Sequence, residues 1–258
     1  MTTNDPVVTL TALAGIPRVR PGDDLATLLG DALARESLTL QDQDVLVVSH
    51  KIVSKAENRY VSLARVSPSA KARRLALQAD KDPALVEVIL SESRAVLRSR
   101  PDLIITEHRL GMVMANAGVD QSNVDDDGNG SSVLLLPQDP DGSCAALRDT
   151  LNQRFGIDLA VIIADSAGRA WRQGVIGLAL GAAGLPALLD LRGRLDLEGR
   201  PLAVSLAGFA DQIASAAELL MGEGAEGRPA VIVRGLSWQE QASPAADLIR
   251  PVEQDLFR

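Results

Sequence analysis

The sequence predicts an α+β fold with mixed sheets. Aliphatic runs typical of strands alternate with amphipathic segments typical of helices, but they do not form the evenly repeated βαβ units of a doubly wound parallel sheet. No self-similarity recurs at a period of about 20–50 residues, which excludes a solenoid or a propeller. Only 2% of the 258 residues are aromatic, whereas 46% are hydrophobic. We therefore expect one domain whose core consists of Leu, Val, Ile and Ala.

The N-terminal half carries clear start and stop signals. Pro-Gly precedes the first helix, whose first turn is acidic, and a proline stands in the first turn of each of the next two. A turn at Gly15-Ile16-Pro17 follows the first strand. The elements predicted here are strands at 7–13, 44–49 and 103–106 and helices at 23–36, 68–79 and 83–91.

The C-terminal half contains the most apolar predicted strand, LAVIIA at 159–164. Glycines at 156 and 222 end two predicted helices, because a glycine adopts the left-handed conformation that closes a helix. The remaining elements are strands at 133–136 and 230–234 and helices at 143–155 and 210–221. The polar segment 125–132 is the candidate internal seam, so two intertwined subdomains are the alternative to a single domain over 1–258.

Charge and cysteine content exclude several classes of protein. The formal net charge is −8, whereas nucleic-acid binders carry a basic excess. The single cysteine, Cys144, excludes an internal disulfide and a cysteine-based metal cage. The longest uncharged apolar stretch, 175–189, is too short to span a bilayer, and the first residues lack the pattern of a signal peptide. We expect a soluble, cytoplasmic protein with no nucleic-acid or membrane partner.

Two motif matches are rejected from their context, and two further site classes are excluded by composition. The segment 222–227 spells GxGxxG, but a helix precedes it and a strand follows, the reverse of a Rossmann motif. Residues 125–130 match the start of an EF-hand loop, but position twelve is Leu136 instead of glutamate. The chain has no Gly-Lys pair and only two histidines, which excludes a P-loop and a histidine-rich zinc centre.

Two scarce lysines follow the predicted strand at 44–49. Lys51 and Lys55 are two of four lysines in the chain, and next to them stands His50. Cations just past a buried strand favour a contact with phosphate or carboxylate. A solvated helix start is the equally weighted alternative.

Oxygen ligands gather in two further segments. Asp120 and Asn123 stand three residues apart in a small-residue segment, which suits Mg²⁺ or Mn²⁺, or else a simple Asx-turn. Asp165 and Ser166 directly follow the LAVIIA strand, and two arginines come soon after. Burying this much charge beside an apolar strand needs partners, so we favour a functional site over a surface turn.

The glycine-rich segment 222–227 adds Glu223 and free amides that are able to line a phosphate. Each of these motifs is weak alone. Together they favour metal-assisted phosphoryl transfer.

The same motifs, in this order, resemble a known family. They are LAGIP at 13–17, SKAE at 54–57, ANAGVDQSN at 115–123, DSAGRAWRQG at 165–174, DLRG at 190–193 and the segment 213–224. From about residue 10 to 235 the chain resembles the F420-0:γ-glutamyl ligases. We expect it to lack the flavin-reductase-like C-terminal extension of the two-domain bacterial ligases.

The resemblance implies an α+β fold that is neither P-loop nor Rossmann, and a homodimer. It implies GTP-dependent formation of an amide bond between the carboxylate of F420-0 and L-glutamate, through an acyl phosphate, with further γ-linked glutamates as an extension. Two divalent cations, Mn²⁺ or Mg²⁺, and a monovalent cation such as K⁺ would take part. A metal-dependent nucleotide phosphohydrolase and a non-catalytic deazaflavin- or nucleotide-binding module are the alternatives.

The resemblance also carries over site residues. Metal ligands would be Asp120 and Asp165 for one cation and Ser166 and Glu223 for the other. Charge in the transition state would be offset by Lys55 and by Arg169 or Arg172. The nucleotide would be bound by Leu13, Ala14, Gly15, Ile16, His50, Lys51, Lys55, Asn123, Met221, Gly222, Glu223, Gly224, Ala225, Glu226, Gly227 and Arg228.

The sequence departs from the family pattern at a few positions. Asn58 replaces the glycine of SKAEG, and asparagine tolerates the same left-handed turn. Ser166 replaces a frequent threonine and keeps the hydroxyl. Glu223 stands where glutamine is also found.

Overall fold

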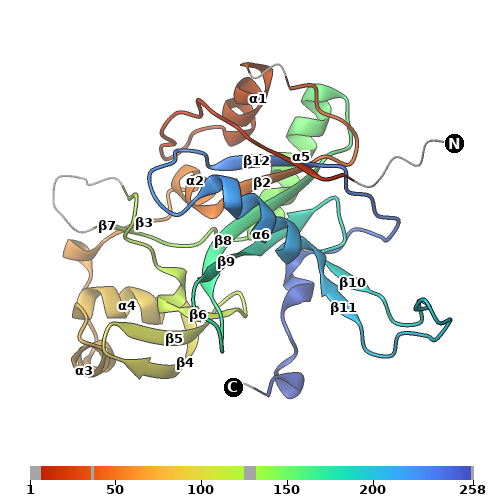
Figure 1. Cartoon of the computed structure of the whole chain (residues 1–258). Helices are drawn as coiled ribbons and strands as arrows, with labels where there is room; N and C mark the ends of the chain where they lie inside the picture. Colours follow the sequence, from red (N-terminus) through yellow and green to blue (C-terminus); the bar gives the residue numbers. More distant parts are fainter. Residues whose placement is uncertain (1–6, 36–37, 125–131, 257–258) are drawn as a thin grey trace, which may run out of the picture.

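A five-stranded mixed sheet runs through the larger region of the molecule (Figure 1). The computed structural model describes residues 7–35, 38–124 and 132–256. The strand order is β1–β12–β2–β8–β9. β2 and β8 pair in parallel, and the other neighbours in this sheet are antiparallel, which confirms the predicted fold class. The bounds are Thr9–Ala12 for β1, Val45–Ser49 for β2, Ala160–Gly168 for β8, Val175–Ala183 for β9 and Ala230–Arg234 for β12.

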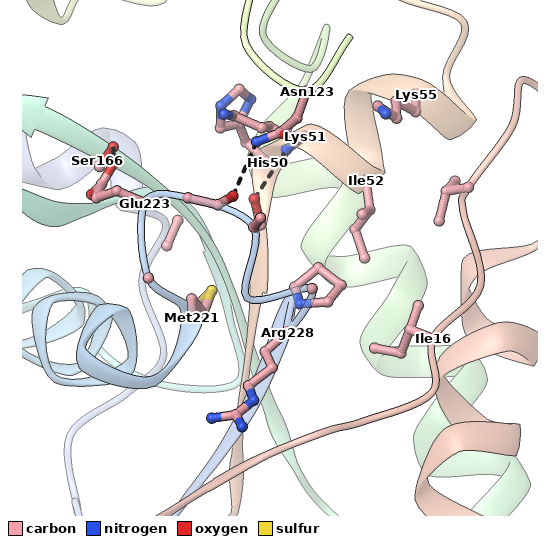
Figure 2. A pocket seen from close by; sticks show the side chains of 18 of the residues that line it. Ile16, His50, Lys51, Ile52, Lys55, Asn123, Ser166, Met221, Glu223 and Arg228 are labelled. Carbon is pink, nitrogen blue, oxygen red and sulfur yellow. Dashed lines mark hydrogen bonds between the residues drawn. The ribbon is translucent and has the colours of Figure 1, made fainter. Parts of the chain in front are cut away.

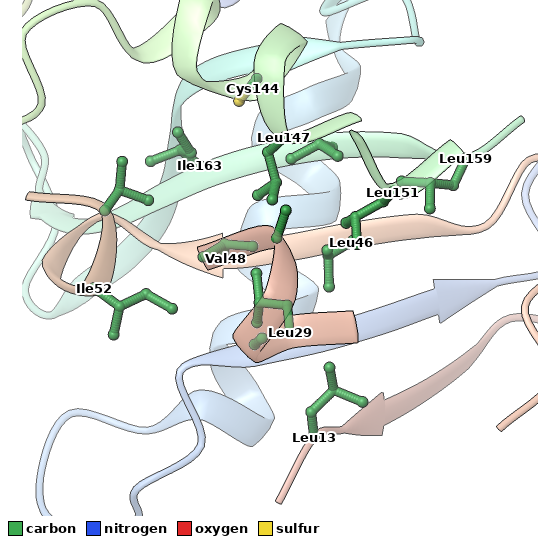
Figure 3. Packing of buried hydrophobic residues seen from close by; sticks show 14 of the residues in the cluster. Leu13, Leu29, Leu46, Val48, Ile52, Cys144, Leu147, Leu151, Leu159 and Ile163 are labelled. Atoms are coloured by element: carbon green, nitrogen blue, oxygen red, sulfur yellow. The ribbon is translucent and has the colours of Figure 1, made fainter. Parts of the chain in front are cut away.

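Helices cover both faces of this sheet. Successive side chains of β2 point to opposite faces and therefore pack into two separate cores. Leu46 and Val48 face the cluster formed with α1 (Leu25–Arg35) and α5 (Pro140–Phe155), as Figure 3 shows. Val45 and Val47 face the second cluster, formed with α6 (Phe209–Met221). The central strands are therefore buried on both sides, which explains their uninterrupted aliphatic sequences.

Glycines let the two helix layers approach β9. A Cβ at Gly177 would lie 2.5 Å from the carbonyl oxygen of Ala214 in α6, and a Cβ at Gly181 would lie 2.3 Å from that of Pro140 in α5. Both distances are shorter than any normal contact, so these positions need glycine for packing. Most of the apolar stretch 175–189 is thus the strand β9, Val175–Ala183, which packs between two helices.

A smaller region, residues 60–135, packs beside this sandwich and has its own core. Its sheet has the order β4–β5–β6, and a separate pair joins β3 to β7. The bounds are Tyr60–Ser62 for β3, Ser93–Arg100 for β4, Leu103–His108 for β5, Val113–Ala115 for β6, Ser132–Leu134 for β7, Ala70–Ala79 for α3 and Pro83–Ser91 for α4.

A cluster of buried charges, which we call the joint cluster, holds the smaller region to the larger one. Glu92 Oε2 accepts from Arg59 at 3.1 Å and from Arg109 at 3.0 Å, and His108 Nε2 lies 3.5 Å away. Arg59 and Arg109 also donate to carbonyls between 136 and 138, in the segment that leads back to α5. Burial alone would raise the pKa of Glu92, but hydrogen bonds from His108 and Arg109 and the charge of Arg59 lower it to about 2.

Short elements complete the described part of the chain. They are α2 (His50–Ala56), β10 (Leu188–Asp190), β11 (Leu206–Gly208) and 3₁₀ turns at Leu63–Arg65, Asn116–Gly118, Ala245–Leu248 and Val252–Gln254. Across the ranges that the structure describes, no helix is long and apolar enough to cross a membrane.

The predicted elements exist, with several shifted boundaries. The helix predicted at 143–155 begins at Pro140, because Asp139 caps it by accepting from the Gly142 N–H. The strand predicted at 159–164 continues to Gly168 as one arm of the β8–β9 hairpin. The helix predicted at 68–79 begins at Ala70 after a Ser69 cap. Asn58 is left-handed at φ 54°, as expected. The rejected EF-hand match and, apart from Ser132, the candidate seam lie outside the described residues.

Candidate functional site

A polar pocket of about 380 Å³ opens at the edge of the main sheet where β2 and β8 end. These strands are parallel, and Ser49 is in register with Ala164. The residues that follow β2 therefore meet those that continue β8 beyond its pairing with β2, as at the ligand sites of many α/β sheets. The lining combines residues 16–19, 49–52, 55, 123, 164–166, 218, 221–225 and 227–229. In Figure 2, Ser166 and Glu223 lie at one side of the pocket and Ile16 and Lys55 at the other.

His50 holds Asp165 at the inner wall of the pocket. The imidazole is 2% exposed, and its Nε2 lies 3.1 Å from Asp165 Oδ1. Its Nδ1 has no hydrogen-bond partner among the described residues. His50 thus fixes one carboxylate oxygen of Asp165 and leaves the other oxygen to the pocket.

Lys51, the next residue, holds Asp120. Its Nζ lies 2.9 Å from Asp120 Oδ2 and donates to Ser122 Oγ at 2.8 Å. Asp120 Oδ1 accepts from the Ser122 N–H at 2.7 Å, which is the Asx-turn considered as an alternative. Burial would raise the pKa of Asp120, but the hydrogen bonds from Lys51 and Ser122 lower it.

Carboxylates concentrate around Ser166 and Asp165. One of them, on α6, was not predicted from the sequence. Ser166 Oγ donates to Glu223 Oε2 at 2.9 Å. Glu218, in the last turns of α6, faces Glu223 and Asp165. Burial and then the negative charge of Glu223 and Asp165 raise the pKa of Glu218 to about 7, against a smaller lowering by His50. This wall therefore carries more negative charge than its neighbours compensate.

The glycine-rich loop 222–227 closes the pocket from the side of β12. Gly222 has φ 71° and its N–H donates to Glu218 O, and Glu226 Oε2 accepts from the Gly224 N–H at 2.8 Å. Asn123 Nδ2 reaches across to Gly224 O at 3.3 Å. A helix precedes this loop and a strand follows it, so the rejection of a Rossmann motif is confirmed.

The donor chemistry suits a hard cation. Carboxylates and a hydroxyl are the ligands that Mg²⁺ and Mn²⁺ prefer, and the repulsion that Glu218 experiences is relieved by a positive charge. Within the described ranges, however, no three His, Cys, Asp or Glu side chains converge as a ready metal cage. Two of the four predicted ligands are engaged by cationic or imidazole groups, Asp120 by Lys51 and Asp165 by His50.

Most of the predicted site residues come together in this pocket. Its lining includes Ile16, His50, Lys51, Lys55, Asn123, Asp165, Ser166, Met221, Gly222, Glu223, Gly224, Ala225, Gly227 and Arg228.

Other predicted residues lie beside the pocket without lining it. The side chain of Leu13 is buried in the core and its N–H donates to Ala230 O, while Ala14 and Gly15 lead into the lining at Ile16. Asp120 lies behind Lys51, and Glu226 shapes the loop. Arg169 and Arg172 lie in the turn beyond the end of β8, so their catalytic role stays a prediction.

Two charged lining residues were not foreseen. Glu218 stands five residues before Glu223 on a helix read only for its apolar face, and Arg18 follows the LAGIP motif. The signal for Glu218 is its acidic side chain one turn before the helix end that opens into the loop. Arg18 carries no such signal in the sequence.

An α+β fold that gathers carboxylates, a hydroxyl and lysines at the end of parallel strands defines an enzyme site for a highly charged substrate. The model of the F420-0:Gamma-glutamyl ligase family matches residues 15–235. The chain belongs to this family, and it is a ligase.

Curated relatives are similar over nearly the whole chain. The coenzyme F420:L-glutamate ligase of Methanopyrus kandleri is 48% identical over 245 residues, covering 93% of this chain and 94% of its own length. The protein of the same name from Methanothermobacter thermautotrophicus is 44% identical over 253 residues, covering 97% and 99%. That of Archaeoglobus fulgidus is 42% identical over 244 residues, covering 95% and 94%.

Proposed function

We propose that this protein joins L-glutamate to the terminal carboxylate of F420-0 in a GTP-dependent reaction. The chain is similar over nearly its full length to ligases named for this reaction. The single structural observation that carries the proposal is the charge imbalance of the pocket. Three carboxylates that line the pocket, Asp165, Glu218 and Glu223, lie close enough together to repel one another, whereas Lys55 lies on the other side of the pocket (Figure 2).

The cationic side of the pocket suits a nucleoside triphosphate. Lys55, Lys51, Arg18 and Arg228 all line it, and lysine and arginine bind phosphate oxygens. The loop 222–227 adds backbone amides to the lining of the same pocket. Lys55 is our candidate for offsetting the charge that develops on the transferred phosphoryl group.

The chemistry follows from the weakness of a carboxylate as an acylating agent. A carboxylate oxygen of F420-0 attacks the γ-phosphorus of GTP, the bond from that phosphorus to the bridging oxygen breaks, and GDP leaves. The glutamate amine then attacks the carbonyl of the acyl phosphate, gives up a proton, and displaces phosphate. The protein contributes position and charge compensation, since it forms no bond to the reactants.

Divalent cations, held by Asp165, Ser166 and Glu223 with Asp120 and Glu218 nearby, would neutralise phosphate oxygens as Lewis acids. His50 keeps Asp165 oriented for this role, because its Nε2 fixes one of the two carboxylate oxygens. Lys51 performs the same task for Asp120.

We also propose a homodimer, which the family resemblance implies. The connection between β10 and β11 exposes Leu195, Leu197 and Val204, by 68%, 105% and 84%. Exposed apolar groups on a projecting arm favour association with a protein surface. Light scattering of the full chain measures the mass directly, and a monomer at all concentrations contradicts the proposal.

Mass spectrometry tests the reaction. Purified protein is incubated with F420-0, L-glutamate, GTP and Mn²⁺, and each component is omitted in turn. We expect products heavier by one or more glutamyl units only when GTP is present. Labelling the F420-0 carboxylate with ¹⁸O tests the intermediate, because an acyl phosphate transfers one label to the released phosphate.

The same reactions distinguish the alternatives. GTP hydrolysis without a heavier product indicates a metal-dependent phosphohydrolase, which the same carboxylates would serve. Tight binding without change in either compound indicates a binding module. Unlabelled phosphate together with a heavier product contradicts the acyl phosphate but not the ligase.

A further inference from the structure

The turn between β8 and β9, residues 169–174, exposes a tryptophan. Trp171 is 86% exposed in a chain that has only two tryptophans. The other, Trp238, packs edge-on against Phe209 at 6.0 Å. Tryptophan has a large flat side chain that is well suited to stacking, and an exposure of 86% leaves most of this surface accessible in a protein poor in aromatic residues.

The backbone at Trp171 is also unusual. Its φ is 68°, a left-handed conformation that bulky residues rarely adopt. The turn is closed by the pairing of Gly168 with Val175, and Arg169 Nη1 donates to Gly174 O at 3.4 Å. Backbone strain that the surroundings maintain concentrates at sites of function.

The hairpin connects this turn directly to the pocket. β8 carries Asp165 and Ser166 into the pocket lining and then continues to Gly168. A strand rises about 3.3 Å per residue, so Gly168 lies about 7 Å beyond Ser166. In Figure 2, Ser166 lies on the side of the pocket opposite Ile16 and Lys55. The turn that carries Trp171 therefore follows the strand that leaves the pocket on the side of Ser166, away from Lys55.

A bulge in the same ladder bends the hairpin. Ile163 pairs with Gly181 and Ala164 with Ala179, so Leu180 is an extra residue of β9. Such bulges increase strand twist and re-aim the residues that follow. The irregularity stands immediately before Asp165, at the point where the strand leaves the core and enters the site.

F420-0 has the shape that this arrangement accommodates. It carries a flat tricyclic deazaflavin at one end and the reacting carboxylate at the other, joined through a phosphodiester. With its carboxylate at the wall of Asp165 and Ser166 and the triphosphate on the lysine side, the rest of the molecule must extend away from the nucleotide. That direction is the one in which β8 runs toward Trp171.

We propose that Trp171 stacks on the deazaflavin ring of F420-0 and that Arg172, the next residue, binds its phosphodiester. This inference rests on the proposed function. Indole faces stack on flat heteroaromatic rings, and an arginine matches phosphate oxygens with a planar pair of donors. The turn 169–174 is then the part of the protein that selects the acceptor.

Kinetics of Trp171→Ala test the proposal. We expect the KM for F420-0 to rise about tenfold, because stacking on an aromatic side chain is worth about this much in affinity. The KM for GTP and kcat at saturating F420-0 stay unchanged, and Trp171→Phe stays within about threefold of the wild type. Leu77→Ala is a matched control, because Leu77 is equally exposed, by 86%, but lies on α3 in the smaller region.

A probe that has the deazaflavin ring but no phosphodiester separates the contributions of Trp171 and Arg172. The ribityl deazaflavin that lacks the phosphate and the acid is used as a competitive inhibitor. Trp171→Ala weakens its inhibition about tenfold, whereas Arg172→Met raises the KM for F420-0 without changing that inhibition. An unchanged KM for F420-0 in Trp171→Ala, while the wild type elongates F420-0 normally, overturns the proposal.

Fluorescence provides a readout that needs no turnover. In a Trp238→Phe background Trp171 is the sole tryptophan, and F420-0 added without GTP or glutamate should quench its emission and saturate. If the wild type elongates nothing, the proposed function is wrong, and this titration still decides whether Trp171 binds a deazaflavin. Absence of saturable quenching contradicts the role of Trp171.

Discussion

Two glutamates in this molecule have pKa values displaced in opposite directions. Glu92 lies in the joint cluster between the two regions, where Arg59, Arg109 and His108 surround it and its pKa falls to about 2. Glu218 lies in the pocket, where burial and two further carboxylates raise its pKa to about 7. Both are partly removed from water, so the difference comes from the charges around them.

The comparison separates structural charge from functional charge. The close neighbours of the Glu92 carboxylate are two arginines and a histidine, so its negative charge is compensated without any ligand. The negative charges of Glu218, Glu223 and Asp165, in contrast, outnumber the cationic groups in contact with them, so this wall is not compensated without a ligand. Perturbed carboxylates of this second kind mark sites that receive a cation or substrate.

The largest expected effect is that of Asp165→Asn. The substitution keeps the shape of the side chain but removes the charge that we place at the phosphoryl groups. We expect kcat to fall by about 10³-fold or more, with an unfolding free energy unchanged within about 0.5 kcal/mol. Mass spectrometry of the glutamylated product measures the first and urea denaturation the second. Turnover near the wild-type rate would refute the assignment of Asp165.

Glu92→Gln is the corresponding change in the joint cluster. It leaves Arg59 and Arg109 without their counter-charge, and breaking such a buried pair costs about 3 kcal/mol of unfolding free energy at pH 7. A carboxylate with a lowered pKa stabilises the fold above the unfolded pKa near 4.5, and this contribution is lost as the pH falls toward 2.

Urea denaturation between pH 7 and pH 3 checks this expectation. The gap between wild type and Glu92→Gln should narrow as the pH falls, and kcat per folded molecule should remain that of the wild type. A gap that is independent of pH would show that the charge of Glu92 is not what stabilises the joint.

Glu218→Gln should change the unfolding free energy in the opposite direction from Glu92→Gln. A carboxyl group with a raised pKa destabilises the folded state as the pH rises from the unfolded value near 4.5 through about 7. Removing the charge should therefore stabilise the ligand-free protein above pH 7 and have little effect at pH 4. We expect about 1–2 kcal/mol, since solvent screens part of the repulsion at this half-buried group. Urea denaturation at pH 8 and pH 4 measures it, and destabilisation at pH 8 would contradict the repulsion.

The smallest expected effects are those of replacing one cationic side chain in the pocket and one in the joint cluster. Lys51→Met should raise the KM for GTP about tenfold, because the lysine lines the pocket. It should also lower stability, because it leaves the partly buried Asp120 without its cation. Arg59→Met should lower stability and leave that KM unchanged, because its guanidinium contacts Glu92 and Leu136 O. Steady-state kinetics and denaturation are measured for both variants. Equal effects of the two variants on the KM for GTP would remove the distinction between the pocket and the joint cluster.

The sequence predicts the sandwich better than it predicts the site. Aliphatic strands such as 44–49 and 159–164 can be recognised from their uninterrupted apolar sequences, because both of their faces are buried. Residues that share one edge of the sheet, such as His50 and Asp165, are also accessible to reasoning, because each directly follows a predicted strand. Their contact depends on the parallel register of β2 and β8, which a single sequence does not reveal.

Other features depend on tertiary neighbours and escape a reading of local pattern. Glu218 lies on a helix whose apolar face dominates its pattern, and its role follows from Glu223 and Asp165 arriving from elsewhere. The engagement of Asp120 by Lys51 likewise joins segments 69 residues apart. The joint cluster has no sequence signature, because Arg59, Glu92 and Arg109 are far apart in the chain and meet only in the folded structure.

The most direct test of the two kinds of charge is the shift in unfolding temperature that GTP with Mn²⁺ produces. A ligand that binds only the folded state stabilises it in proportion to the logarithm of its saturation. We expect equal stabilisation of the wild type and Glu92→Gln, and none of Asp165→Asn. A full shift in Asp165→Asn, or its loss in Glu92→Gln, would contradict the division between a pocket that holds reactants and a joint that holds the fold.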